Sequence, residues 1–233
     1  LNDPRVRYVS RENKGLIATL NEGIALAKGD YIARMDADDI AHSTRLSRQV
    51  AFLQHHPDVA VVGTAYNIIN SNDERTGVRH PPRWHCLITP MFIFGSPMAH
   101  PAVMLNKKLA EADLFYDKDY IHAEDYELWL RLSLKYKLAN LAAICLDYRV
   151  LPQSISRRYA KEQRQSVIKA QLAHLYLSDT NTQKLADSAA VLLRYNVACW
   201  WQQMVAFCNV VRHRKAPFSR GIALIYLLRN MLR

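Results

Sequence analysis

A short apolar run that ends in a row of acids constrains this chain more than any other feature. Residues 31–35 have the pattern of a short buried strand, and Asp36-Ala37-Asp38-Asp39 follows at once. In an open α/β sheet, ligands bind beyond the carboxyl ends of the strands. Extended geometry sends residues i and i+2 to the same side, so Asp36 and Asp38 are predicted to face one ligand. Two hard oxygen donors suit Mg²⁺ or Mn²⁺, although an acidic turn that only caps the next helix has the same sequence pattern.

Strand and helix patterns alternate around these acids. Residues 5–10 alternate with period two, as a half-buried strand does, and residues 15–27 carry apolar side chains at helical spacing. The stretch 44–57 has the pattern of a second helix, and residues 59–62 form an apolar strand that Gly63 closes. This alternation predicts an α/β layered fold rather than a helical bundle or a β-sandwich.

The rest of the chain divides into a loop-rich middle and a helical end. Residues 71–101 are rich in Pro, Gly, Asn and Arg without a sustained period, which predicts loops and short strands over an active face. An amphipathic helix is predicted to begin near Glu124. The predicted domains are a catalytic domain over residues 1–158 and a basic, amphipathic helical extension over residues 159–233.

The net charge of +10 is concentrated in the C-terminal third. Residues 1–150 hold 18 Lys and Arg against 18 Asp and Glu, whereas residues 151–233 hold 13 against 3. Such a basic segment meets phosphate on nucleic acid or on a membrane surface. Trp200 and Trp201 lie in an apolar stripe beside basic residues, which fits a helix resting on a membrane and equally one packed on the catalytic body.

Composition excludes several other classes of protein. No apolar stretch is long enough to span a bilayer, because Arg, Lys or Gln interrupts each one. Four scattered cysteines fit neither a disulfide framework nor a zinc site and indicate reduced thiols in a cytoplasm. The basic tail lacks zinc-finger spacing and any identifiable recognition helix, so no nucleic-acid partner is expected.

A second pair of acids, Glu124-Asp125, stands at the start of the predicted amphipathic helix. Acids are common there because the exposed amides and the helix dipole stabilise them as anions. Alternatively, one of the pair accepts a proton from an attacking hydroxyl, since burial and the adjacent carboxylate raise its pKa.

Two weaker motifs complete the candidates. Asn13-Lys14-Gly15 opens the first helix, where free amides and a lysine can hold phosphate, although a single glycine at a helix start is usually just a turn. His100-Pro101 precedes an apolar strand, and a lone histidine in such a place is more often structural than a ligand.

Five segments together, in this order and spacing, resemble family 2 glycosyltransferases with the GT-A fold. They are Asn13-Lys14-Gly15, Asn21-Glu22-Gly23-Ile24-Ala25, Gly29 to Asp39, His100-Pro101 and Glu124 to Leu132. The resemblance covers about residues 1–160. It implies a mixed, mostly parallel sheet flanked by helices.

The resemblance also implies a role for each matching residue. Asp36 and Asp38 match the Asp-x-Asp motif, which contacts the donor ribose and a divalent metal, Mn or Mg, that bridges the sugar diphosphate. Asp125 matches the acid that deprotonates the acceptor hydroxyl, and Glu124 lies close to the acceptor. His100 is assigned to the acceptor side, and Asn13, Lys14 and Gly15 to the donor side. The segment 153–157 resembles the loop that closes over the donor.

The implied reaction is an inverting transfer of a sugar from a nucleotide diphosphate sugar to a glycan or lipid-linked acceptor. Cell-surface polysaccharide synthesis is the expected setting, in the cytoplasm or peripherally on the inner face of the plasma membrane. Two alternatives remain open. One is a catalytically inactive glycosyltransferase-like partner subunit, and the other is a nucleic-acid-binding module that uses the basic C-terminal third.

One departure from the family stands out. The chain begins at what resembles the family's third strand, so the two strands before it, with the turn that holds the nucleobase, have no counterpart. The missing first strand is central in the family's sheet. The strand that carries Asp36 is therefore expected to have an unpaired edge. The 233 residues are expected to be a piece of a longer protein and, alone, to be poorly stable or inactive.

Overall fold

The computed structural model of this chain describes residues 3–92, 94–151, 154 and 158–176. The chain divides into a unit Leu1–Ala189 and a unit Ala190–Arg233, and only the first contains described residues. The predicted interfacial segment with Trp200 and Trp201 lies outside the described residues. The domain boundary predicted at 158/159 stays a prediction.

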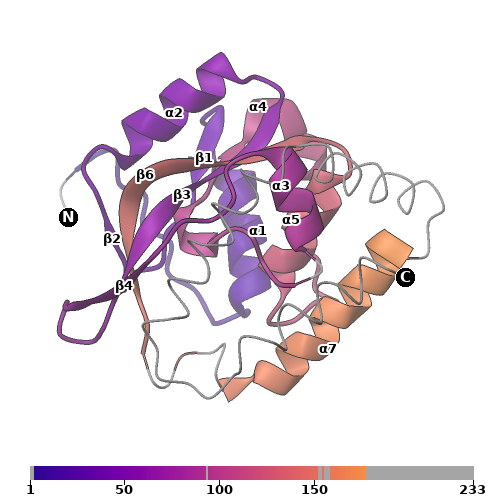
Figure 1. The fold of residues 1–233 in the computed structure, drawn as a ribbon. Helices are drawn as coiled ribbons and strands as arrows, with labels where there is room; N and C mark the ends of the chain where they lie inside the picture. Colours follow the sequence, from indigo (N-terminus) through magenta and orange to yellow (C-terminus); the bar gives the residue numbers. More distant parts are fainter. Residues whose placement is uncertain (1–2, 93, 152–153, 155–157, 177–233) are drawn as a thin grey trace. The chain divides into compact units, whose positions relative to one another are not determined.

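The described elements alternate between strands and helices (Figure 1). They are α1 (Leu16–Leu26), β1 (Tyr31–Ala33), β2 (Ile40–Ala41), α2 (Arg45–His55), β3 (Val59–Ile69), β4 (Arg75–Arg79), α3 (His85–Met91), the 3₁₀ helix η1 (His100–Ala102), β5 (Met104–Asn106), α4 (Lys107–Ala110), the 3₁₀ helix η2 (Glu111–Asp113), α5 (Glu124–Ser133), β6 (Lys137–Arg149), α7 (Ala160–Gln171) and the π-helical turn η3 (Leu172–Tyr176). No helix in the described part of the chain combines the length and apolar character that crossing a bilayer requires.

The strands form one mixed sheet in the order β1-β5-β3-β6-β2, and β4 pairs with β3 beside it. The expected α/β class, with a mixed sheet flanked by helices, is confirmed. The expectation that pairing is mostly parallel is wrong for the described strands, because only β3 and β6 run parallel and the other pairs are antiparallel. β4 follows β3 after the short connection 70–74, which reverses the chain and makes the two strands antiparallel neighbours.

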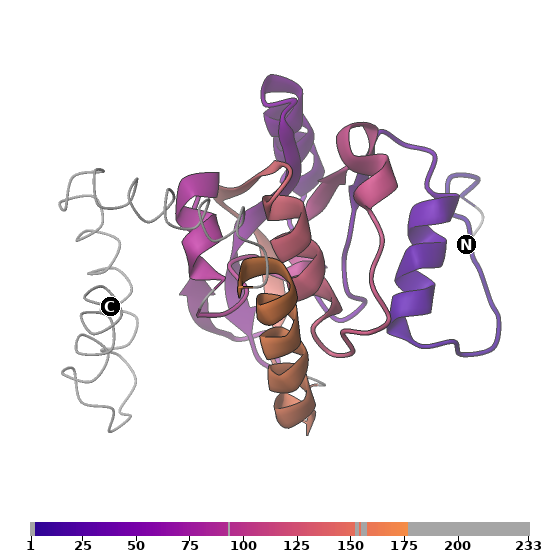
Figure 2. The same cartoon turned by 90° about the vertical axis from the view of Figure 1, so that its right-hand side faces the viewer.

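Helices cover both faces of the sheet (Figures 1 and 2). Neighbouring residues in β3 point to opposite faces, so Val61 joins one buried cluster and Val62 the other. The larger cluster packs α3 and α5 on the sheet, with Trp129 fully buried and the apolar side of α1 against it. The smaller cluster packs α2 on the opposite face through Leu53. The core thus fixes where each strand ends.

Two predicted strands differ from the structure. Residues 5–10 form no strand, because no described strand lies beside them to accept their hydrogen bonds. The strand predicted over 59–62 does not stop at Gly63 but continues to Ile69. A Cβ at Gly63 would lie 2.1 Å from the side-chain oxygen of Asn140, so the glycine makes room for that side chain inside the sheet.

β1 is an edge strand of the described sheet. It pairs with β5 through Tyr31–Asn106, Ile32–Leu105 and Ala33–Met104, and no other described strand pairs with it. α1 beside it has no buried residue. The strand that leads into the acids therefore has one open side among the described residues, as expected from the sequence.

Candidate functional site

The acids after β1 form a turn rather than an extended segment. The amide of Asp39 donates to the carbonyl of Asp36 at 3.4 Å, so Ala37 and Asp38 are at the corner of a four-residue turn. Residues 36–39 are therefore not extended, so the geometric argument for placing Asp36 and Asp38 on the same side does not apply, and a ligand shared by the two acids stays a prediction. Asp38 is exposed, whereas Asp39 turns inward and is 6% exposed.

Arg34 holds the first acid of this turn. Its guanidinium makes two contacts of 2.5 Å with the two carboxylate oxygens of Asp36. This bidentate pair has a half-buried arginine, 10% exposed, and a carboxylate that is 40% exposed. The charge of Asp36 is thus partly neutralised before any ligand binds, and nothing in the sequence analysis singled out Arg34.

The two acids differ as metal ligands. Among the described residues, no group of three or more His, Cys, Asp or Glu side chains is arranged to hold a metal ion. The side chain of Asp38 makes no hydrogen bond or ion pair with a described residue, so its carboxylate oxygens are available to a hard cation. Asp36 would have to share its carboxylate with Arg34. The donor set fits a divalent cation that takes most of its ligands from substrate phosphate and water.

A buried polar pair in α2 fixes the strand ends beneath the turn. Arg45, 1% exposed, donates to the carbonyls of Arg34 at 2.6 Å and Val103 at 3.1 Å. Its Nε donates to Gln49, whose amide in turn donates to the carbonyls of Val62 and Ala102. One face of α2 thus donates hydrogen bonds to carbonyls from three neighbouring segments. These hydrogen bonds hold the C-terminal end of β1 in place.

Arg149, at the end of β6, clamps the turn from the other side. Its amide donates to Oδ1 of Asp39 at 2.8 Å, and its Nε donates to the carbonyl of Asp38 at 2.7 Å. Its remaining nitrogens contact the carbonyl of Asn70 at 2.7 Å and the carboxylate of Asp73 at 2.5 Å, both in the β3–β4 hairpin loop. The acidic turn, the end of β6 and this hairpin loop are therefore linked through one arginine.

Burial perturbs Asp39. Desolvation raises the pKa of its carboxyl to about 6, and the charges of Asp36 and Asp38 add to the rise. Its Oδ2 is buried with no hydrogen-bond partner among the described residues. Asp39 is thus an anchor inside the protein, whereas Asp38 is the acid that the turn presents to solvent.

The second acid pair begins α5, as predicted. Glu124 is 7% exposed and Asp125 is half-buried, in the first turn of the helix. Burial, followed by the neighbouring charge of Glu124, raises the pKa of Asp125 to about 6, against the opposing effects of the Tyr126 amide and Arg34. The sequence predicts two opposing effects on the pKa of this carboxyl, and burial, which raises it, outweighs the helix amides, which lower it.

The charges of both acid stretches influence the pKa values of two tyrosines, Tyr148 and Tyr116. Burial, and then the carboxylates of Asp39, Asp36 and Asp125 among its neighbours, raise the pKa of Tyr148 to about 12. Burial raises the pKa of Tyr116 above its ordinary value, and among the charges that act on it are Asp125 and Asp36. Carboxylates from both stretches therefore lie within electrostatic reach of the same two side chains.

His100 contacts one of these two tyrosines, Tyr116. Its Nε2 is 2.8 Å from the hydroxyl of Tyr116, and its ring packs edge-on against Trp129 with centroids 5.9 Å apart. Burial, helped by the charge of Arg34, holds the pKa of His100 well below its usual range, so the imidazole is neutral. One ring nitrogen is thus already engaged within the protein.

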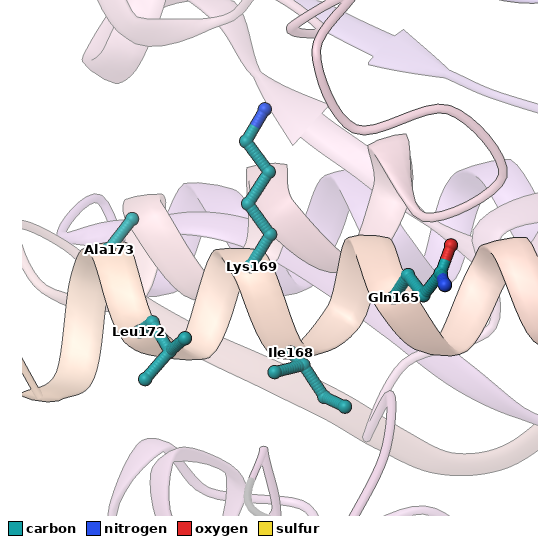
Figure 3. A pocket seen from close by; sticks show the side chains of 5 residues that line it. All are labelled: Gln165, Ile168, Lys169, Leu172 and Ala173. Carbon is teal, nitrogen blue, oxygen red and sulfur yellow. The ribbon is translucent and has the colours of Figure 1, made fainter.

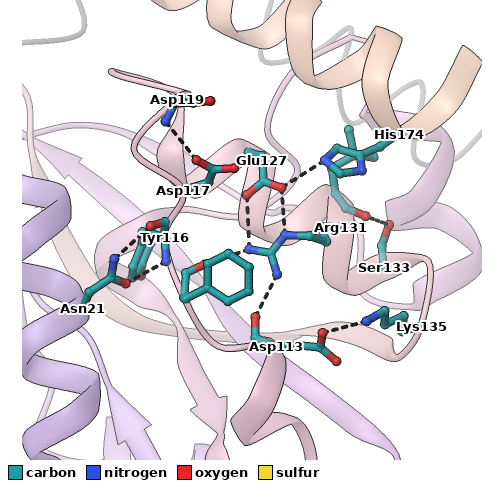
Figure 4. A network of polar contacts seen from close by, with 12 residues as sticks. Asn21, Asp113, Tyr116, Asp117, Asp119, Glu127, Arg131, Ser133, Lys135 and His174 are labelled. Atoms are coloured by element: carbon teal, nitrogen blue, oxygen red, sulfur yellow. Dashed lines mark hydrogen bonds and ion pairs between the residues drawn. The ribbon is translucent and has the colours of Figure 1, made fainter. Parts of the chain in front are cut away.

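Asn21 in α1 holds the segment that carries Tyr116. Its side chain accepts from the Tyr116 amide at 2.7 Å and donates to the Tyr116 carbonyl at 2.8 Å (Figure 4). On the other side of the same segment, Glu127 of α5 pairs with Arg131 and His174. This explains the Asn21 motif, for which the sequence alone indicated no role.

The predicted donor segment stays apart from these contacts. The amide of Gly15 donates to Oδ1 of Asn13 at 2.8 Å, and Gly15 has a φ of 83°, which favours glycine. Lys14 is exposed. The described contacts do not bring Asn13, Lys14 or Gly15 to the acidic turn. Most of the predicted donor loop 153–157 lies outside the described residues.

A hollow of 440 Å³ lies elsewhere, along α7 (Figure 3). Its lining is almost entirely apolar and contains none of the predicted site residues. The lining residues are Gln165, Ile168, Lys169, Leu172 and Ala173.

Sequence reasoning missed Arg34, Tyr116, Tyr148 and Arg149. Each is a single polar residue within or beside a strand or loop. Its role depends on a distant segment that lies against it, which the local sequence does not indicate.

A mixed α/β sheet covered by helices agrees with the GT-A fold that the sequence motifs imply. The model of the family described as Glycosyl transferase family 2 matches residues 1–125, and the chain belongs to this family.

Similar proteins carry related names. An uncharacterized glycosyltransferase of Haemophilus influenzae is 29% identical over 208 residues, which cover 84% of this chain and 64% of the relative. The O-antigen biosynthesis glycosyltransferase WbnJ of Escherichia coli is 31% identical over 158 residues, covering 66% of this chain and 61% of WbnJ. The chain thus spans less than two thirds of the length of these two relatives.

A solved structure has a similar fold. The mannosyltransferase PcManGT from Pyrobaculum calidifontis, in complex with GDP-Man and Mn²⁺, superimposes with a TM-score of 0.50 at 14% identity. The match covers 94% of this chain and 60% of that chain. At this identity the likeness concerns the fold alone.

Proposed function

We propose that this chain carries the metal-binding and acceptor-activating part of an inverting glycosyltransferase. Its donor is a nucleotide diphosphate sugar, and its acceptor is a glycan or lipid-linked glycan of a cell-surface polysaccharide. The observation that carries the proposal is the half-buried Asp125, with a pKa of about 6, whose charge acts on the same tyrosines as that of Asp36. The names of WbnJ and of PcManGT, which was solved with GDP-Man and Mn²⁺, agree with this class of reaction.

Asp125 is the proposed base. At pH 7.5 a carboxyl with a pKa of about 6 is ionised, yet more basic than an ordinary aspartate, which favours proton acceptance. The acceptor hydroxyl oxygen attacks the anomeric carbon while its proton passes to Asp125. The bond from that carbon to the diphosphate breaks on the opposite face, so the configuration inverts. Glu124 and His100 are proposed to border the acceptor.

Asp38, with Asp36, is the proposed holder of a divalent cation, Mn²⁺ or Mg²⁺, whose charge would offset that of the leaving diphosphate. Asp36 is also proposed to contact the donor ribose, and Asn13, Lys14 and Gly15 the donor phosphates. Arg34 holds the carboxylate of Asp36 in a fixed orientation at the exit of β1. Arg45 holds the backbone of Arg34 in turn.

Transfer assays with the chain, and with the longer protein where one exists, test the proposal. UDP- and GDP-sugars are supplied with Mn²⁺ and a panel of glycan acceptors. Asp125→Asn is expected to abolish transfer while nucleotide-sugar binding, measured by calorimetry, is retained. Wild-type protein that binds donor but transfers nothing would point to the inactive partner subunit instead. Transfer by Asp125→Asn at the wild-type rate would refute the assignment of the base.

The localisation proposed is cytoplasmic, with peripheral contact to the inner face of the plasma membrane. The excess of Lys and Arg in residues 151–233 supports attraction to anionic lipid. Flotation of the full chain with phosphatidylglycerol liposomes, and its loss at high salt, is the expected result. Equal recovery with neutral and anionic liposomes would contradict it.

A further inference from the structure

The loop before the acid pair contains a strained histidine. His122 has a φ of 66°, and Asp73 is the only other non-glycine residue with positive φ in the described part of the chain. Glycine adopts this conformation without strain, whereas a residue with a Cβ is disfavoured there. Backbone strain of this kind concentrates at functional sites, which makes the side chain of His122 a candidate for a functional role.

Helix α7 holds this loop in place through its backbone. Gln163 donates to the carbonyl of His122 at 2.8 Å, and Ser166 donates to the carbonyl of Ile121 at 2.8 Å. Lys169 donates to the carbonyl of Asp119 at 3.0 Å. Three contacts from one helix therefore fix the loop without using the imidazole of His122.

The ring of His122 stacks on Tyr159, directly before α7. The centroids are 4.3 Å apart and the planes differ by 10°. Both residues are half-buried, so the pair keeps a solvent-facing part. The guanidinium of Arg158 lies 5.5 Å from the centre of the Tyr159 ring, and Arg158 is exposed. The pair thus combines flat aromatic surface with hydrogen-bond donors.

His122 lies close to the acid pair in the sequence. It precedes Glu124 and Asp125 by two and three residues, and Ala123 between them is the N-cap of α5. The C–H face of a sugar ring packs on aromatic rings, while its hydroxyls bind charged groups at the edge. Ligand sites generally combine aromatic walls with a few polar groups of this kind.

We propose that His122 and Tyr159 form a subsite for a sugar ring of the acceptor, beside the hydroxyl that Asp125 deprotonates. The proposal rests on the proposed function for the role of Asp125. The competing explanation is that the two rings only lock α7 to the loop. The three backbone contacts from α7 allow the two explanations to be separated.

The test compares ring-deleting variants with a variant that weakens the lock. His122→Gly removes the ring and relieves the strain, and Tyr159→Ala removes the other ring. Ser166→Ala is the matched control, because it removes one contact from α7 to the loop and leaves both rings. Each full-length variant is assayed for acceptor KM, for donor KM and for hydrolysis of the donor by water. Saturation-transfer NMR with methyl α-mannoside and methyl β-N-acetylglucosaminide measures sugar binding without turnover.

Each ring deletion is expected to raise the acceptor KM about 3- to 10-fold and to weaken the methyl glycoside signal. Donor KM and donor hydrolysis stay at wild-type values, and Ser166→Ala leaves the acceptor KM unchanged. Unchanged acceptor KM and NMR signal in both ring variants would overturn the proposal, as would an equal rise in Ser166→Ala. If wild-type protein uses no donor, the proposed function fails, and the NMR comparison alone decides the subsite.

Discussion

Replacing Asp125 by asparagine is expected to stop sugar transfer and to make the fold more stable at neutral pH. The carboxylate of Asp125 is held in a half-buried position beside the charge of Glu124, and both conditions penalise its ionised form. Asparagine has nearly the same shape and keeps an oxygen that can accept from the Tyr126 amide, as Asp125 does at 2.7 Å. The substitution therefore removes a charge and little else.

The magnitude follows from the pKa. In the folded chain the pKa of Asp125 is about 6 instead of 3.8, which corresponds to about 3 kcal/mol at roughly 1.4 kcal/mol per pKa unit. Because Asp125 retains contact with solvent, a gain of about 1–3 kcal/mol is expected for the asparagine variant. The folded state binds the proton more tightly than the unfolded state. Wild-type stability therefore falls as pH rises from about 4 to 6 and then stays level with respect to this group.

Urea unfolding at several values between pH 4.5 and pH 8 measures the effect. The advantage of Asp125→Asn should be about a third of its full size at pH 4.5 and reach nearly its full size above pH 6.5. Asp38→Asn is the control, because it removes an exposed charge from the acidic turn and is expected to change stability little at any pH. The reasoning is refuted if Asp125→Asn is less stable than wild type at pH 8, or if its advantage does not depend on pH.

Three further substitutions test how the site is held. Arg149→Ala removes the side-chain contacts to the hairpin loop and to the carbonyl of Asp38, which should cost about 1–3 kcal/mol in urea unfolding and raise the Mn²⁺ concentration needed for half-maximal transfer. Asp73→Asn, which removes only the ion pair to Arg149, should do less. Gln49→Leu leaves two buried carbonyls without donors, and a loss of about 2–4 kcal/mol by urea unfolding is expected. Gly63→Ala forces a Cβ to within 2.1 Å of the Asn140 side chain, so calorimetry should show a lower Tm, equivalent to about 1–3 kcal/mol, which an added Asn140→Ala partly restores.

Local patterns in the sequence predict three of the helices and miss α3, which lies in the segment 71–101 that was expected to hold loops and short strands. The helices expected around residues 15–27, 44–57 and from Glu124 are present as α1, α2 and α5. Their apolar spacing reports directly which side is buried, and no distant partner is needed to form their hydrogen bonds. The strand before Asp36 also formed where expected, since its apolar run is bounded by turn residues.

The strands and the site depend on distant partners. Residues 5–10 alternate as a strand does, but no described strand pairs with them. Gly63 has the sequence pattern of a strand end, yet it lies inside β3, where the side chain of Asn140 occupies the space beside it. The turn at residues 36–39 is held by Arg149, more than 100 positions away in the chain, so a local rule for extended residues did not predict the turn. The roles of the proposed site residues remain predictions.

The hairpin loop after β3 looks like an ordinary surface connection, yet its length is constrained. Asp73 has a φ of 63° and reaches Arg149, whose guanidinium also holds the carbonyl of Asp38. One residue inserted between Asn70 and Asp73 would carry that carboxylate away from its arginine. Length variation in this loop is therefore expected to alter cation dependence in natural and engineered relatives, even where every acid is unchanged.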